Sequence, residues 1–392
     1  MDKFSYIHGS TIFLKMTQAL LPSGLQDLLP PDAAREQHLI TELLNAFSAN
    51  GYQQVTPPMV EFEETLLDGK GLAYAPQTFR VPDPLSQKMM GLRADITTQV
   101  ARIASNQLSA HPKPLRLSYA GRVLRSVPQG LFPERQLVQS GFEVIGVDTN
   151  AAMAEVILVS AQALSAVGCD ALVVDLTLAG LLDILLSTIH FSSEDARQQV
   201  ISAVKRKDVA ALADDLPVKD TLKALLSLPT HAPETLRAVE HIALPAVVKE
   251  WFSGLSQVYE IVMRDAPQLR LTIDPLESHG FEYHEGLCFS LFDKAKGREV
   301  GRGGRYVIHE SPELLVACGA TLYVRAILEC GYLPNIQRPS VMLAPETTSA
   351  QADALRMQGY VTLRAITQRD WRDEAQALGC SHLWHDETLI EL

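Results

Sequence analysis

The chain has 392 residues, 47% of them apolar, which is enough for two or three domains with a sizeable core and excludes a disordered chain. No apolar run reaches the length of about 18–20 residues that spans a bilayer. The formal net charge is −12, from 46 acidic and 34 basic residues, whereas a nucleic-acid-binding surface needs a basic face. We therefore expect neither a membrane nor a nucleic acid as a partner.

Five cysteines are scattered along the chain, and no CxxC pair occurs. An odd number without paired spacing predicts neither a zinc site nor a disulfide framework, and it is typical of the reducing cytoplasm. Residues 1–15 precede the patterned sequence and do not form a secretory signal, so we interpret them as an N-terminal extension or a remnant of expression.

The first patterned segment, "PPDAAREQHLITELLNAFSANGY", predicts an amphipathic helix. Asp32 can cap its start and Asn50-Gly51 can end it. The following "YQQVTPPMVEF" is extended, and Pro57-Pro58 excludes a central strand at that point.

Alternating strands and helices continue to residue 178. "KMMGLR" predicts a short strand and "ADITTQVARIASNQL" a helix, with Asp95 or Thr97 near its first turn. "PLRLSYAGRVLRS" and "QLVQSGFEVIGV" predict two strands joined by the turn-rich loop "VPQGLFPE". A helix over "NAAMAEVILVSAQALSAVG" and a strand over "ALVVDL" complete this part.

Residues 179–260 are rich in Leu, Ala, Lys and Asp at helical spacing, which predicts an inserted helical bundle. Strands return from residue 271 as "LTIDPL", "GFEYH", "LCFSLF" and "REVGRGGRY", followed by a helix over "ATLYVRAILEC". The last sixty residues predict a small α/β unit with one terminal strand. Together these elements indicate an α+β protein, with an antiparallel sheet flanked by helices.

"HGFEYHEGLCFSLF" carries His279, His284 and Glu285, which are candidate metal ligands. Their spacing is not that of a zinc helix, and in an extended segment His279 lies opposite His284. We therefore expect no metal site. "GRGGRY" does not open a helix after a strand, so it predicts a tight hairpin rather than a phosphate loop. We expect no cofactor.

Polar residues inside the predicted strands indicate a different kind of site. Gln139 and Glu143 are four apart and point to one face of a strand. Arg125 and Arg135 flank the turn-rich loop and can clamp an anion, while Asp95 can either cap a helix or bind an ammonium. Each residue alone fits an ordinary surface or capping role. Together they can line a pocket for a zwitterion.

The order of these segments resembles class II aminoacyl-tRNA synthetases, most closely the histidyl-tRNA synthetases, from "LPSGLQDLLPPDAA" to about residue 328. "GYQQVTPPMVE" is similar to the first class motif and "GRVLRSVPQGLFPERQLVQSGFEVIG" to the second. "HGFEYHEG" resembles a peptide specific to the histidine enzymes. The resemblance implies a class II synthetase-like domain over 16–330, with the helical insertion at 179–260, and a small C-terminal α/β domain over 335–392.

Carried over residue by residue, the resemblance implies a histidine-binding pocket. The matching residues are Asp95, Thr97, Arg125, Gln139, Glu143, Tyr283, His284 and Tyr306, with His284 standing where the family has a tyrosine. Positions that serve ATP and catalysis in the family depart from its pattern. His279 replaces an arginine, Val127 replaces an adenine-reading glutamate, and Leu322 and Val324 flank Arg325 without the expected acid. One lost electrostatic donor costs about 10²–10³ in rate.

These departures, together with a tail too short for an anticodon-binding domain, resemble the regulatory-subunit family of ATP phosphoribosyltransferase. The resemblance implies a homodimer without catalytic residues that binds and activates the short catalytic subunit and transmits feedback inhibition by histidine. Two alternatives remain open at this point. One is an active histidyl-tRNA synthetase or another adenylate-forming ligase, and the other is a stand-alone histidine sensor.

Overall fold

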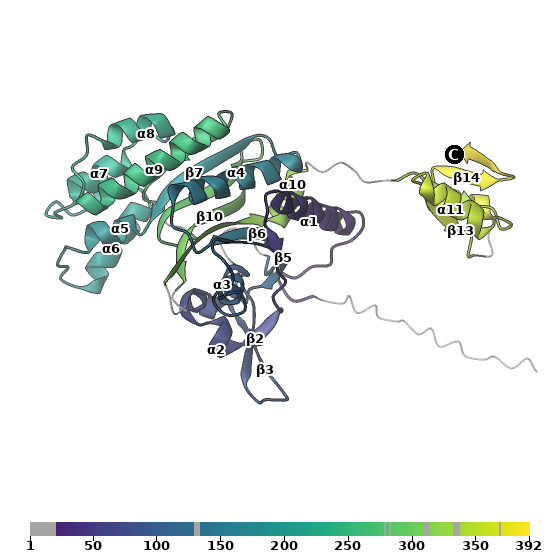
Figure 1. Ribbon diagram of the computed structural model, residues 1–392, viewed down its shortest axis with the longest axis horizontal. Coiled ribbons are helices and arrows are strands. Elements are labelled where there is room, and N and C mark those ends of the chain that lie inside the picture. Colours follow the sequence, from purple (N-terminus) through teal and green to yellow (C-terminus); the bar gives the residue numbers. More distant parts are fainter. Residues whose placement is uncertain are drawn as a thin grey trace, which may run out of the picture. The chain divides into compact units, whose positions relative to one another are not determined.

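The computed structural model describes residues 21–128, 134–277, 280–281, 284–308, 314–331, 338–367 and 370–392. The chain divides into two compact units, Met1–Leu333 and Pro334–Leu392. Figure 1 shows the first unit as a large twisted sheet with helices on both faces. The described residues contain no helix that is both long enough and apolar enough to cross a membrane.

The central sheet has eight strands in the order β1-β5-β6-β11-β10-β9-β7-β8. Neighbouring strands are antiparallel except for the two edge pairs, β1 with β5 and β7 with β8, which are parallel. This confirms the predicted α+β class. The strands are β1 Gln53–Gln54, β5 Leu115–Leu124, β6 Gln136–Ile145, β7 Leu172–Ala179, β8 Arg270–Ile273, β9 Gly286–Asp293, β10 Arg298–Ile308 and β11 Leu315–Tyr323.

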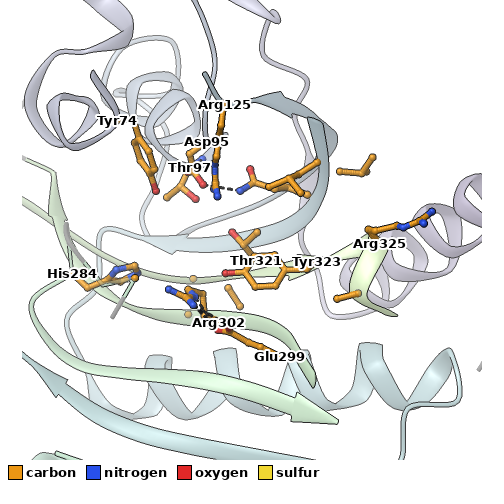
Figure 2. Close-up of a pocket in the computed structure, with 18 of the residues that line it drawn as sticks. Tyr74, Asp95, Thr97, Arg125, His284, Glu299, Arg302, Thr321, Tyr323 and Arg325 are labelled. Carbon is orange, nitrogen blue, oxygen red and sulfur yellow. Dashed lines mark hydrogen bonds and ion pairs between the residues drawn. The ribbon is translucent and has the colours of Figure 1, made fainter. Parts of the chain in front are cut away.

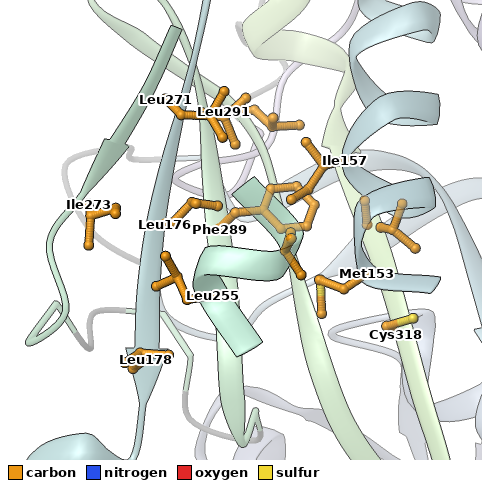
Figure 3. Close-up of a cluster of buried hydrophobic side chains, with 14 of the residues drawn as sticks. Met153, Ile157, Leu176, Leu178, Leu255, Leu271, Ile273, Phe289, Leu291 and Cys318 are labelled. Atoms are coloured by element: carbon orange, nitrogen blue, oxygen red, sulfur yellow. The ribbon is translucent and has the colours of Figure 1, made fainter. Parts of the chain in front are cut away.

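One face of this sheet is covered by long helices and holds the main core. Figure 3 shows Met153 and Ile157 of α4 and Leu255 of α9 meeting Leu176, Phe289 and Leu291 from the strands. These side chains are fully or almost fully buried, so the core fixes the sheet from behind. The covering helices are α1 Asp32–Ala49, α4 Asn150–Ala166, α9 Ala246–Asp265 and α10 Val324–Cys330.

The opposite face carries a smaller core around helix α3, Thr97–Ser105. Ile96, Val100 and Ala104 pack there against Tyr119 and Tyr306 from the sheet. A three-stranded sheet in the order β2-β4-β3 precedes α3 in the sequence. Its parts are β2 Val60–Phe62, α2 Glu63–Leu66, η1 Gly69–Gln77, β3 Phe79–Pro82 and β4 Met89–Leu92.

Between β7 and β8 the chain forms a run of helices, which Figure 1 shows gathered at one end of the sheet. They are α5 Leu181–Leu186, α6 Glu194–Lys205, η2 Val209–Ala211, α7 Lys219–Leu226 and α8 Ala232–Val239, followed by α9. The C-terminal unit has a four-stranded sheet in the order β13-β12-β14-β15. It consists of β12 Ser340–Leu343, α11 Ser349–Met357, β13 Val361–Arg364, α12 Trp371–Ala377, β14 His382–His385 and β15 Thr388–Glu391.

Two expectations, one about the start of the first helix and one about the last strand, need correction. Helix α1 begins at Asp32 itself, with Pro31 as the N-cap residue and no side-chain cap, while Gly51 does adopt a left-handed φ of 84° after it. The C-terminal unit ends in two paired strands, β14 and β15, rather than one. Asp386 and Glu387 take positive φ values between them, which makes a tight hairpin turn.

Three expectations around the site were also wrong. "GFEYH" is not a strand at its described residues, because Gly280 has a φ of 82° and the His284 N–H donates to Phe281 O in a turn. "ATLY" ends strand β11 instead of starting a helix. "GRGGRY" lies inside β10 rather than in a hairpin. Its glycines are needed for packing, since a Cβ on Gly303 would lie 2.3 Å from Gly319 O.

Candidate functional site

The floor of the site is a patch where three neighbouring strands present small or polar residues to one face. Gln139, Gly141 and Glu143 alternate along β6, directly opposite Tyr323, Thr321 and Gly319 of β11. Arg302 and Gly304 of β10 lie opposite Thr321 and Gly319. A Cβ on Gly319 would lie 1.8 Å from Glu143 Oε2. The glycine therefore makes the room in which this carboxyl group lies.

Asp95 is fixed between helix α3 and strand β6, with 5% of its surface exposed. One carboxylate oxygen accepts from the Thr97 N–H at 2.8 Å, and the other accepts from Gln139 Nε2 at 2.8 Å. Gln139 Oε1 accepts from the Ile96 N–H at 3.2 Å, which locks the amide in place. Asp95 therefore accepts from the first N–H group of α3, whose N-cap residue is Ile96, and presents its buried carboxyl group to the cavity.

Glu143 is buried under two tyrosines and a threonine. The Tyr306 hydroxyl donates to its Oε2 at 3.1 Å and the Tyr119 hydroxyl to its Oε1 at 3.4 Å. Burial raises the pKa of Glu143 to about 8, although hydrogen bonds from Tyr306, Thr97 and Tyr119 oppose the shift. Tyr119 also exchanges hydrogen bonds with Thr97 and Thr321, which ties α3 to β11. A carboxyl group with this pKa can donate or accept near neutral pH.

These groups line one cavity of about 510 Å³, within the range of about 300–1,000 Å³ typical of small-molecule sites. Figure 2 shows Asp95, Thr97 and Arg125 on one side and His284, Arg302 and Glu299 on the other. Seven of the eight residues predicted to bind histidine line it: Asp95, Thr97, Arg125, Gln139, Glu143, His284 and Tyr306. The eighth, Tyr283, lies outside the described residues.

Sequence reasoning missed half of the polar lining. The cavity also contains Tyr74, Glu134, Arg298, Glu299, Arg302, Thr321, Tyr323 and Arg325. Alternation along β11 places Gly319, Thr321 and Tyr323 on one face, and recognising "LVACGATLY" as a strand would have identified them. Arg135, which was considered as an anion clamp, does not line the cavity, and its Nε donates to Arg125 O.

The side of the cavity formed by β10 and α10 is dominated by ion pairs. Arg302 pairs with Glu299, while Arg298 and Arg325 both pair with Glu329 of α10. These side chains are between 18% and 32% exposed, so solvent screens them in part. Arg125 Nε donates to Ala94 O at 3.3 Å, beside Asp95.

Positions that the synthetase resemblance links to nucleotide handling fall in different places. Val127 is 50% exposed and does not line the cavity. Leu322 and Val324 are fully buried and alternate along the chain with the cavity residues Tyr323 and Arg325. His279 lies outside the described residues.

The candidate metal ligands His279, His284 and Glu285 stay untested as a group, since His279 lies outside the described residues. Among the described residues, one group has ligand atoms close enough together to hold a metal ion. It lies in the C-terminal unit and consists of Glu346, His385 and Asp386. Exposed groups of this kind are common without an ion.

Comparison with known proteins gives consistent results. Residues 24–327 match the histidyl-tRNA synthetase family model. The chain is 42% identical to the ATP phosphoribosyltransferase regulatory subunit of Rhodospirillum centenum, over 96% of this chain and 97% of that protein. It is also 42% identical to the protein of the same name from Paramagnetospirillum magneticum, over 96% of this chain and 98% of that one.

Solved structures share the fold at low sequence identity. An ATP phosphoribosyltransferase regulatory subunit/histidyl-tRNA synthetase from Bacillus halodurans superposes with a TM-score of 0.77 at 21% identity, covering 92% of this chain and 97% of the other. Histidyl-tRNA synthetase from Nostoc gives a TM-score of 0.74 at 18% identity, covering 93% and 90%. These likenesses confirm the class II synthetase-like architecture.

Proposed function

The chain belongs to the family of ATP phosphoribosyltransferase regulatory subunits. From that premise we propose that it binds histidine and that this binding causes feedback inhibition of a short catalytic subunit. The observation that carries the proposal is the cavity that brings together Asp95, Gln139, Glu143 and Tyr306. A carboxyl group suited to an ammonium group, just before α3, and one suited to a ring nitrogen, on β6, line the same cavity.

Histidine fits this cavity by charge and hydrogen bonding. Its ammonium group would pair with Asp95, whose carboxylate is already oriented by Thr97 and Gln139. Its imidazole would meet Glu143 and Tyr306, with His284 and Tyr283 beside the ring. An amino acid without the imidazole would leave Glu143 and Tyr306 unpaired by ligand, and this is how the pocket would select histidine.

Feedback requires that histidine bind one state of the assembly more tightly than another. The coupling is reciprocal, so a partner that shifts this chain between two states also changes its affinity for histidine. We propose that this chain activates the catalytic subunit when histidine is absent, and that it has no catalytic residues of its own. We also propose a homodimer, since symmetric dimers are the commonest soluble assemblies.

The test combines the purified full chain with the short catalytic subunit. We expect a complex of defined mass, a higher rate of phosphoribosyl transfer than the catalytic subunit alone, and inhibition by histidine. The variant Glu143→Gln should keep the complex and the activation but lose sensitivity to histidine. If the wild-type chain neither raises turnover nor changes sensitivity to histidine, the proposal is wrong.

An adenylate-forming ligase is the second candidate, because the histidyl-tRNA synthetase family model matches residues 24–327. ATP–pyrophosphate exchange that depends on histidine would establish it. We expect no exchange, since Val127 replaces the adenine-reading acid and is 50% exposed, outside the cavity. A stand-alone sensor would bind histidine without forming a complex with the catalytic subunit.

A further inference from the structure

Glu299 and Arg302 form a close ion pair on the wall of the cavity, with Arg302 Nη2 2.8 Å from Glu299 Oε1. Arg302 Nε donates to Glu299 Oε1 at 2.9 Å, and Arg302 Nη2 donates to Glu299 Oε2 at 2.9 Å. The side chains are 18% and 20% exposed, so the pair is largely withdrawn from water. Hydrogen bonds from two guanidinium nitrogens to the carboxylate hold the guanidinium in position.

A backbone irregularity makes this pair possible. Residues three apart in a regular strand point to opposite faces of the sheet. The register of β10 against β9 shifts between Glu299 and Gly301, which is a β-bulge. The bulge turns Glu299 to the face of Arg302, and both then line the cavity. Glu299 Oε1 also accepts from Ser290 Oγ of the neighbouring strand β9 at 3.2 Å, which helps to hold the carboxylate beside Arg302.

Two aromatic rings and a glycine also surround the guanidinium. It lies 5.3 Å from the centre of the Phe281 ring and 6.0 Å from that of Tyr323, within the range of cation–π contacts. Gly280 has a φ of 82°, and a Cβ built there would lie 1.3 Å from Arg302 Nη1. Any side chain at position 280 would therefore displace the guanidinium.

The other arginines that line the cavity have partners as well, and the pair of Arg298 with Glu329 links β10 to α10. Arg298 and Arg325 both pair with Glu329 on helix α10, and Arg125 donates to the Ala94 carbonyl. A histidine zwitterion with its ammonium at Asp95 brings a carboxylate that must meet a cation when water is excluded. Figure 2 shows Arg302 across the cavity from Asp95, with Thr321 and Tyr323 between the two.

We propose that Arg302 receives the carboxylate of the amino-acid ligand, and that Glu299 holds the guanidinium in position while the cavity is empty. The inference rests on the proposed histidine pocket and adds to it the residue that recognises the acid end of the ligand. It predicts that the site binds free amino acids with an ionised carboxylate and discriminates against their alcohol or amide analogues.

Calorimetric titration of the full chain with histidine and with histidinol, the analogue in which CH₂OH replaces the carboxylate, tests the assignment. We expect the wild-type chain to prefer histidine by about 10–100-fold, the range for a hydrogen bond to a charged group. The double variant Glu299→Gln with Arg302→Met leaves no unpaired charge, and its preference should fall to within about threefold. Its affinity for histidinol should stay near the wild-type value.

A matched control comes from the same strand. Arg305 forms a two-pronged pair with Asp148 at 2.8 and 2.6 Å and does not line the cavity. The double variant Asp148→Asn with Arg305→Met should keep the full preference for histidine. This control separates loss of a recognition group from general loss of an ion pair on β10.

Each other outcome contradicts the assignment in a distinct way. If the Glu299/Arg302 variant keeps the wild-type preference, another cation receives the carboxylate and only this inference is wrong. If the wild-type chain binds neither compound, the histidine pocket itself is wrong. If inorganic phosphate stabilises the wild-type chain through Arg302, while histidine and histidinol bind equally, the pair serves a phosphate ligand and the carboxylate assignment is overturned.

Discussion

The two sides of the cavity are built differently, and we call the side formed by α3 and β6 its acidic end and the side formed by β10 and α10 its arginine end. At the acidic end, Asp95, Gln139 and Glu143 are at most 5% exposed. Gln139 donates to Asp95, and Tyr306 donates to Glu143. At the other end, Arg298, Arg302 and Arg325 are 18–32% exposed and pair with nearby glutamates. The first end is more deeply buried and acidic, while the second is more exposed and its charges are paired with one another.

This difference separates recognition from packing. A buried carboxylate held by two donors keeps its geometry without a ligand, so a cation or a ring N–H can bind with little reorganisation. A half-exposed ion pair contributes little to stability, because solvent screens it. We therefore expect substitutions at the Glu143 end to have large effects and those at the arginine end, Arg302 apart, to have small ones.

The largest effect is expected for Gly319→Ala, which would place a methyl group 1.8 Å from Glu143 Oε2 and 2.5 Å from Phe142 O. The backbone carbonyl cannot move aside, so overpacking should cost about 1–3 kcal/mol or more and abolish histidine binding. Urea unfolding and calorimetry measure the two effects. The control Gly254→Ala lies within helix α9, where the nearest atom is 3.4 Å away, and should be neutral or stabilising by up to about 1 kcal/mol. Equal stability of both variants would contradict the steric argument.

Asp95→Asn is expected to have the next largest effect, because it removes the charge while keeping the shape of the side chain. Histidine affinity should fall by about 30-fold or more, the consequence of losing one partner of a buried charge pair. The fold should persist, since an amide oxygen can still accept from the Thr97 N–H. Calorimetry measures the affinity, and circular dichroism checks the fold. Unchanged affinity would mean that the ammonium binds elsewhere.

Glu143 gives the cavity a pH dependence whose sign follows from its raised pKa. Between pH 4.5 and about 8 the folded chain keeps a proton on Glu143 that the unfolded chain has released. The stability tied to this group is therefore full below pH 4.5 and is lost as the pH rises towards 8. The side chain in Glu143→Gln does not titrate. As the pH rises across this window, the free energy of unfolding of the variant should therefore increase relative to that of the wild type, by up to about 1.4 kcal/mol per pH unit. A difference that is independent of pH would contradict the raised pKa.

The acidic end of the cavity could be predicted from sequence, because regular periodicity governs it. Gln139 and Glu143 lie on a straight strand, so a spacing of four places both on one face. Asp95 stands at a strand-to-helix junction, where its hydrogen bond with the Thr97 N–H is local. The class II likeness also brought Thr97, Tyr306 and His284 to the same cavity.

The arginine end could not be predicted in the same way, because irregular backbone governs it. The bulge after Glu299 breaks the period of two, so sequence spacing gives the wrong face for Glu299 relative to Arg302. The left-handed turn at Gly280 likewise defeated the expected strand over "GFEYH". Strand β11 was missed because "LVACGATLY" mixes small residues and has no clear polar alternation, and Thr321 and Tyr323 were missed with it.

The smallest effect is expected for Arg325→Met, and it tests the contrast between the two ends most sharply. Arg325 lines the same cavity as Asp95, but its Nε pairs with Glu329 one helical turn away at 2.7 Å, and the two side chains are 32% and 29% exposed. Glu329 keeps Arg298 as a second partner, so no buried charge is left alone. Stability should change by about 0.5 kcal/mol or less, and histidine affinity by less than about twofold. A loss of affinity comparable with that of Asp95→Asn would show that the ligand reaches α10, and the division of the cavity into a binding end and a packing end would fail.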